Sequence, residues 1–320
     1  MLPVCVVVAS VAMFSGISGA ALLTPVFLIG FPLVDVPPLT AVQAIGSALF
    51  LETFGFGSGV VGYARRRHPD YRLLTKLVLV TVPLGIVGAL LARDAPATTL
   101  KAIYGGVMFV VAAILIAEAR TRRDRSHDHV GADDSGWDAA RLTSGDDARA
   151  SSRRGDWRSW REYQWESDGT RWIRARDGTV YSYRPRGETG TRTLTGIGAF
   201  FAGLISTGVG EATAPNLIRR VKMPVPVAAA TSTLVVASTV VGAALTHLVQ
   251  LAVEGGLSAI PWNLVVWAVP GAIVGAQIGS RLQGRIDERK TNYFFGVLFT
   301  LIGAAFFLSF TLFSDTFRTG

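Results

Sequence analysis

The segment Pro83-Leu-Gly-Ile-Val-Gly-Ala89 returns late in the chain as Pro270-Gly-Ala-Ile-Val-Gly-Ala276. A shorter match follows in the same order, Gly106-Val-Met-Phe109 and Gly296-Val-Leu-Phe299. Ordered matches at a nearly constant offset indicate an internal duplication. We therefore predict that the chain contains two copies of one structural unit.

The segments that precede these matches also correspond between the two halves. The first segment of each half has a run of small residues that ends on proline, Gly16-Ile-Ser-Gly-Ala-Ala-Leu-Leu-Thr-Pro25 and Gly208-Val-Gly-Glu-Ala-Thr-Ala-Pro215. The second segments both follow paired prolines. Each half therefore has four apolar segments, which are Leu2–Phe31, Thr40–Tyr63, Leu73–Ala92 and Leu100–Ala119, then Leu194–Ile218, Val225–Leu251, Trp262–Leu282 and Tyr293–Phe313.

The composition is that of a membrane protein. Half of the 320 residues are apolar and 17% are charged, whereas soluble domains carry about 25% charged residues. Charged residues concentrate between Glu118 and Arg192, and elsewhere the apolar runs suit a bilayer core that needs about 20 helical residues per crossing. The sequence therefore predicts an all-α polytopic membrane protein. Residues 1–19 lack the basic start of a signal peptide, so we expect them to belong to the mature protein.

Clusters of Lys and Arg mark the cytoplasmic side of a membrane protein. The loops near Arg65, Arg120, Arg219 and Arg281 are all basic. Eight single crossings would put the loops near Arg65 and Arg281 on opposite sides. If the first segment of each half instead breaks and turns back, all four loops lie in the cytoplasm, and the turn at Asp94 is the exception. Each half then has a broken, re-entrant first helix and three spans, which inverts the second repeat relative to the first. Whether each arm of the broken helix stops midway or crosses the membrane stays open.

The two breaks predict a binding site. Irregular backbone at membrane depth is tolerated where it is buried or lines a cavity. Beyond each break a half-helix begins, whose first N–H groups lack partners and carry partial positive charge, so two such ends facing each other would bind a small anion. The predicted substrate-binding residues are Gly16, Ser18, Gly19, Ala20, Ser47, Gly208, Gly210, Thr213, Thr231 and Ser232. Each of them taken alone is also explained by close helix packing.

Glu211 lies in the second run, at a place where the first run has Ala21. A charged side chain at membrane depth costs about 2.5–3.5 kcal/mol on insertion scales and suggests a function. If Glu211 is protonated, it is a candidate carrier of a coupled proton. The alternative is a structural ion pair or a helix cap. For Glu52, in the second segment, both packing and cavity lining stay open.

The small-residue runs resemble those of the sulfite exporter TauE/SafE family, also called the 4-toluene sulfonate uptake permease family. The resemblance rests on the run followed by Pro in each first segment, and on the Pro-flanked loop and Ala/Thr/Ser-rich span from Pro224 to Thr233. It covers the chain except for its polar middle. It implies a cell-membrane transporter of sulfite, an organosulfonate or a related small anion. The first copy reads Ser18-Gly-Ala-Ala21, where the family's run is richer in glycine.

The polar middle of the chain, residues 120–193, separates repeat 1 (residues 1–119) from repeat 2 (residues 194–320). Its flanking arginines predict that it is cytoplasmic. Two Asp-Gly turns, at Asp168 and Asp177, lie between alternating aromatic and polar residues and predict a small three-stranded β-meander. So small a sheet is marginal alone, and we expect it to pack on the transporter or on a cytoplasmic partner. The candidates for its apolar face are Trp157, Trp160, Trp165 and Trp172.

Other classes of function are disfavoured or left open. The net charge of +8 comes from short clusters beside apolar segments and from arginines interleaved with acids, so we expect no nucleic-acid partner. The apolar segments contain no His-Glu-x-x-His motif and no paired aspartates, so we expect neither an enzyme nor a bound cofactor or metal. A permease or channel for another solute or ion, and a membrane sensor with the insert as its output domain, stay open as alternatives.

Overall fold

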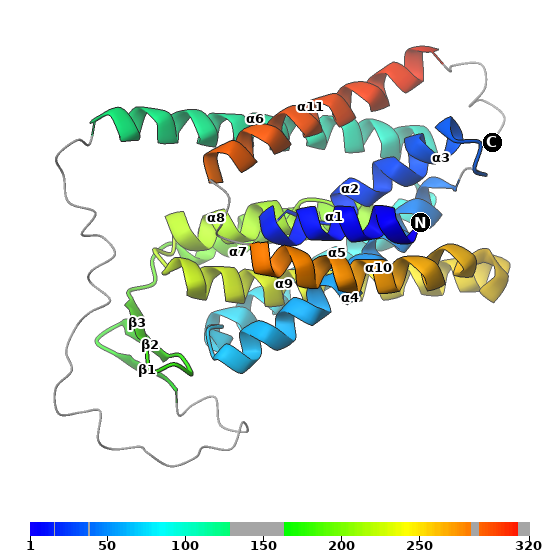
Figure 1. Ribbon diagram of the computed structural model, residues 1–320. Coiled ribbons are helices and arrows are strands. Elements are labelled where there is room, and N and C mark those ends of the chain that lie inside the picture. Colours follow the sequence, from blue (N-terminus) through cyan, green and yellow to red (C-terminus); the bar gives the residue numbers. More distant parts are fainter. Residues whose placement is uncertain (16, 38, 129–162, 283–287, 313–320) are drawn as a thin grey trace.

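The chain is seen here in a computed structural model (Figure 1), and its structure is described for residues 1–15, 17–37, 39–128, 163–282 and 288–312. The described part is mostly helical, with one small sheet. The helices of the first half are α1 (Leu2–Ser15), α2 (Ala20–Pro25), the π-helical turn η1 (Val26–Gly30), α3 (Phe31–Leu33), α4 (Ala41–Arg66), α5 (Tyr71–Asp94) and α6 (Ala97–Asp128). Those of the second half are α7 (Glu188–Ile205), α8 (Val209–Arg219), α9 (Val225–Gly255), the 3-10 turn η5 (Leu257–Ala259), α10 (Trp262–Leu282) and α11 (Glu288–Leu312).

Six of the described helices are long and apolar enough to cross a membrane, namely α4, α5, α6, α9, α10 and α11. Three of them belong to each half of the sequence. This confirms the prediction of a multi-pass helical membrane protein. The first segment of each half does not form such a span, because it is divided into shorter helices.

Each first segment is divided at its small-residue run. Helix α1 ends at Ser15 and α2 begins at Ala20, while α7 ends at Ile205 and α8 begins at Val209. The α1–α2 pair enters from the end of the bundle that holds the N-terminus, and the α7–α8 pair enters from the opposite end (Figure 1). Gly208 has a φ of +123°, and an added Cβ would lie 2.9 Å from the Gly198 carbonyl oxygen. Glycine is therefore required at this turn, because other residues rarely adopt that conformation.

Glycine seams hold the helix pairs together. Helix α1 packs on α10, where an added Cβ at Gly271, Gly275 or Gly279 would collide with backbone carbonyls of α1. Helix α7 packs on α5 in the same way, since an added Cβ at Gly203 would collide with the Gly85 carbonyl oxygen. Helix α4 packs on α9, and α6 packs on α11. Backbones this close are typical of helix association in membranes, where small residues allow the approach.

The sheet contains β1 (Gln164–Ser167), β2 (Thr170–Arg174) and β3 (Val180–Tyr183) in the antiparallel order β1-β2-β3. This confirms the predicted β-meander. The first Asp-Gly turn has positive φ at both Asp168 and Gly169, and the second has it at Gly178, as tight hairpin turns require. The sheet lies at the end of the bundle where α4 and α10 end and α9 begins (Figure 1).

The sheet is joined to the loop between α4 and α5 by hydrogen bonds. The Arg176 amide donates to the Arg66 carbonyl oxygen at 3.0 Å. The Tyr71 amide donates to Gln164 Oε1 at 3.2 Å, and Gln164 Nε2 donates to the Pro69 carbonyl oxygen. The predicted packing of the meander on the helical part of the chain is therefore observed.

A buried ion pair also ties the sheet to both halves. Arg171 Nη1 lies 3.3 Å from Asp70 Oδ2, and its Nη2 lies 2.7 Å from Glu188 Oε1. Asp70 caps α5 by accepting from the Leu73 amide, and it also accepts from the Tyr183 hydroxyl. Burial alone would lower the pKa of Arg171, but Asp70, Tyr183 and Glu188 together raise it above its ordinary value. Arg171 therefore stays charged and connects the start of α5 to the start of α7.

The apolar face of the sheet differs from the prediction. Ile173 and Tyr183 are buried against the bundle, whereas Trp165 is exposed and stacks on Trp172 at a ring separation of 6.2 Å. The reason is strand alternation, because Trp172 lies between two buried positions of β2 and so points to the outer face. Trp157 and Trp160 lie outside the described residues.

Candidate functional site

Ser18, in the turn between α1 and α2, lies at the centre of a buried polar cluster. Its hydroxyl donates to Glu52 Oε1 of α4 at 2.7 Å, and its amide donates to Glu211 Oε1 of α8 at 3.2 Å. The two carboxylates therefore meet on one residue, although they come from different halves of the chain. Ser18 and Glu52 are 2% and 5% exposed, and Glu211 is partly buried, so the hydrogen bond between Ser18 and Glu52 lies inside the protein.

The two turns also contact each other directly. The Ser18 hydroxyl lies 3.4 Å from the Ser206 carbonyl oxygen. The Ser206 hydroxyl also lies 2.6 Å from that of Thr24, which belongs to α2. The predicted meeting of the two tips is therefore observed. From here on, "tip 1" means residues 17–20 and "tip 2" means residues 206–210.

Glu211 is held by backbone donors from both tips. Its Oε1 accepts from the Ser18 amide of tip 1, and its Oε2 accepts from the Gly208 amide of tip 2 at 3.0 Å. The second contact caps α8, because Glu211 lies in the first turn of that helix, where a negative charge is stabilised by the helix dipole. The arrangement shows that N–H groups of the two tips converge on a pair of carboxylate oxygens.

Two buried polar atoms of Glu52 and of tip 2 have no hydrogen-bond partner among the residues that the structure describes. One is Glu52 Oε2, and the other is the hydroxyl of Thr207 in tip 2, whose residue is 1% exposed. An unpaired buried polar atom costs about 1–3 kcal/mol, so such atoms often mark a place where a ligand, a proton or a water belongs.

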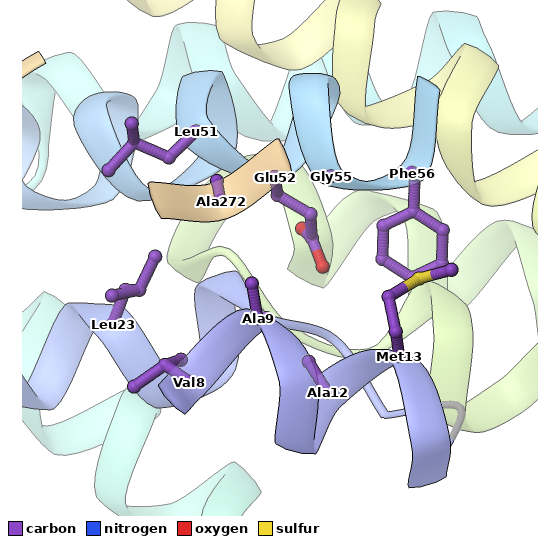
Figure 2. A pocket seen from close by; sticks show the side chains of 11 residues that line it. Val8, Ala9, Ala12, Met13, Leu23, Leu51, Glu52, Gly55, Phe56 and Ala272 are labelled. Carbon is purple, nitrogen blue, oxygen red and sulfur yellow. The ribbon is translucent and has the colours of Figure 1, made fainter. Parts of the chain in front are cut away.

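Glu52 also borders a small cavity. Its side chain points from α4 toward α1, between Met13 and Phe56 on one side and Ala9 and Ala12 on the other (Figure 2). The cavity has a volume of about 20 Å³, which suits about one water molecule. Its other lining is apolar, so Glu52 is the polar group that a solute there would meet.

Some of the predicted site residues lie at the two tips, and others lie elsewhere in the helices. Ser18, Gly19, Ala20, Gly208 and Gly210 lie at the tips, and Gly16 lies outside the described residues. Thr213 is buried in α8, where its hydroxyl donates to the Val209 carbonyl oxygen at 2.5 Å. Thr231 is engaged elsewhere, since its hydroxyl accepts from the Asp70 amide at 2.9 Å, and Ser232 bonds within its own helix. Ser47 is buried in α4.

Two residues of this cluster, Ser206 and Thr207, were not predicted, and Glu52 was predicted only as packing or cavity lining. Ser206 and Thr207 directly precede the predicted tip residue Gly208, so the small-residue run could have been extended to them. For Glu52 the signal was the cost of a carboxylate within a span. Because Glu52 is far from the tips in the sequence, the sequence did not indicate that its partner is Ser18. Among the described residues, no three His, Cys, Asp or Glu side chains are grouped as a metal site requires.

Replacing Ser18 by alanine should destabilise the bundle by about 1–3 kcal/mol, because Glu52 would lose its hydroxyl donor inside the protein. The measurement is thermal unfolding of the purified protein in detergent. Ser10→Ala is the control, since the Ser10 hydroxyl bonds only within its own helix, to the Val6 carbonyl oxygen. Equal unfolding temperatures for the two variants would show that the Ser18–Glu52 bond does not contribute to stability.

Comparison with known proteins places the chain in a family. Residues 1–306 match the protein family described as sulfite exporter TauE/SafE. A protein of Sinorhizobium sp named "Probable membrane transporter protein ORF9" is 32% identical over 94 residues, which cover 29% of this chain and 33% of that protein. No solved structure matches the chain. With a family match over nearly its whole length and six candidate spans, the chain belongs to the sulfite exporter TauE/SafE family of membrane transporters.

Proposed function

We propose that this transporter is a secondary transporter of a small anion, sulfite or an organosulfonate, which it binds between tip 1 and tip 2. The observation that carries the proposal is the convergence of the Ser18 and Gly208 amides on one pair of carboxylate oxygens. Sulfite and sulfonates offer similar oxygens, and backbone N–H groups at a helix N-terminus suit them. The name of the family supports the same class of substrate.

We further propose that the two halves are inverted repeats. The packing pattern supports this, because it is unchanged when the halves are exchanged. Helix α1 of one half packs on α10 of the other, and the corresponding α7 packs on α5. The central pairs α4–α9 and α6–α11 join corresponding helices. Such a relation is typical of secondary transporters with a site at the repeat interface.

The basic ends of the helices support a cytoplasmic location for the sheet and for the insert, residues 120–193. The ends of α4, α6 and α10 and the start of α9 all lie at the end of the bundle that carries the sheet (Figure 1). Arginine and lysine cluster at these ends, which is typical of the cytoplasmic side. At the opposite end, Arg93 forms an ion pair with Glu254 at 2.5 Å, so Arg93, one of the two basic residues at the Asp94 turn, is paired with an acid.

Glu211 and Glu52 supply the proposed coupling to protons. Two carboxylates that share Ser18, one buried and one partly buried, repel each other when both are ionised, so the cluster favours the binding of a proton. An anion that enters beside them is repelled less when a proton enters too. We therefore expect anion uptake to be driven by a proton gradient directed inward, that is, by a lower pH outside than inside.

The test is uptake of sulfite by proteoliposomes with and without a pH gradient. Wild-type flux should rise with the gradient, and in Glu211→Gln this stimulation should be lost, because the amide does not exchange a proton. Glu254→Gln, at the far end of the bundle, removes one carboxylate as a control. Stimulation that survives in Glu211→Gln would remove Glu211 from the coupling. Absence of flux for sulfite and for every sulfonate would overturn the proposed substrate class.

A further inference from the structure

We infer that the Glu211 carboxylate occupies the anion site itself, as a tethered stand-in for the substrate, so that substrate and ionised Glu211 compete for the same N–H groups. This rests on the proposed function and adds to it the means by which anion binding and proton binding are linked.

The geometry of Glu211 differs from that of an ordinary helix cap. A cap satisfies donors of its own helix, as Glu211 Oε2 does at 3.0 Å from the Gly208 nitrogen. Glu211 Oε1 instead accepts from Ser18 of the opposite tip at 3.2 Å. One carboxylate thus accepts from one amide of each tip, and a bound oxyanion would use the same two amides.

The site contains an additional donor that Glu211 does not use. The Thr207 hydroxyl is buried beside Gly208 and has no partner within the described residues. A sulfonate or sulfite has three oxygens, whereas a carboxylate has two. An oxyanion with three oxygens therefore offers tip 2 one more acceptor than the Glu211 carboxylate does.

Protonation decides which of the two anions is bound. An ionised carboxylate accepts from both amides, whereas a protonated one keeps one strong acceptor and gains an O–H donor. Neutral Glu211 therefore competes less well, and the tips become free for the substrate. The anion then binds together with a proton, which makes the transport a symport of the two.

Other ionisable groups face the tips from the helices packed around them. Glu52 reaches Ser18 from α4. Tyr104 of α6 donates its hydroxyl to the Ala21 carbonyl oxygen at 2.6 Å. His247 of α9 bonds through Nε2 to the Gly203 carbonyl oxygen at 2.8 Å, one turn before tip 2. None of these three accepts from the Ser18 or Gly208 amide, so the competition is specific to Glu211.

The test is equilibrium binding of methanesulfonate to the purified protein from mildly alkaline to mildly acidic pH. This ligand stays a monoanion throughout, so any pH dependence belongs to the protein. For the wild type we expect the apparent affinity to increase up to about tenfold per pH unit as pH falls, as linkage to one proton requires. In Glu211→Gln and Glu211→Ala the dependence of the affinity on pH should be weaker than in the wild type, since only Glu52 still titrates beside Ser18, and binding at mildly alkaline pH should be tighter than that of the wild type. Thermal unfolding confirms that each variant is folded.

The outcomes separate the two proposals. If the wild type binds methanesulfonate and the Glu211 variants keep the wild-type pH dependence, or bind more weakly than the wild type at every pH while folded, the competition is wrong and the transporter proposal stands. If either Glu211→Gln or Glu211→Ala does not fold, the folded one of the two tests the competition. If the wild type binds neither methanesulfonate nor sulfite at any pH, both proposals are overturned. Glu254→Gln should match the wild type in every measurement.

Discussion

Replacing Gly203 by leucine will prevent assembly of the bundle. The Cβ of any larger residue would collide with the Gly85 carbonyl oxygen and approach the Ala89 nitrogen within 2.9 Å. Overpacking of a tight interior costs about 1–3 kcal/mol and occasionally more. Here the colliding atoms are backbone, which cannot rotate away as a side chain does, so we expect the upper end of that range or beyond.

The measurement is the yield of monodisperse protein from gel filtration in detergent, together with its unfolding temperature. Gly106→Leu is the matched control, because Gly106 also lies within a helix and an added Cβ there meets nothing within 4 Å. Equal yield and stability for the two variants would mean that the α5–α7 seam is not as close as described.

Replacing Arg171 by methionine should release the sheet from the bundle. Asp70 and Arg171 side chains are 2% and 7% exposed, and removing one partner of a buried ion pair typically costs about 3–5 kcal/mol because the other charge stays buried. The measurement is hydrogen exchange of the β2 and β3 amides, which should lose their protection. Asp70 would also lose its cation at the start of α5, so protection of the first turn of that helix should fall as well.

Two further variants sharpen this experiment. Arg176→Met is the control, since the Arg176 side chain is exposed and its bond to Arg66 is made by the backbone. The double variant Asp70→Asn with Arg171→Met should recover much of the protection. It removes both charges together, and asparagine still caps a helix well. Full protection in the single variant Arg171→Met would show that the ion pair does not hold the sheet.

Local sequence was a good guide to the elements of this fold. The breaks fall at the two small-residue runs. In the second run serine and glycine allow the turn, since Ser206 and Gly208 both have positive φ. The hairpin turns at Asp168 and Gly178 follow from equally local preferences. In each of these cases the residues that determine the conformation are neighbours in the chain.

The contacts between elements were much less predictable. Glu52 and Ser18 come together because α4 packs beside the first hairpin, and nothing in either segment encodes the other. The sequence does not distinguish Arg171 from the other arginines of the insert, yet its side chain pairs with Asp70. Thr231 was assigned to the substrate site because it lies among small residues, whereas its hydroxyl accepts a hydrogen bond from the Asp70 amide. Such pairings depend on tertiary packing, which helical and strand periodicity do not specify.

The exchange of partners between halves has a consequence for biosynthesis. Helix α1 is made before the other described helices, but the surface it packs on belongs to α10, about 250 residues later in the sequence. At about 5–20 residues per second, α1 waits on the order of ten to fifty seconds for that surface. Helix α7 finds α5 already made. The first hairpin therefore completes its packing only after α10 has been made.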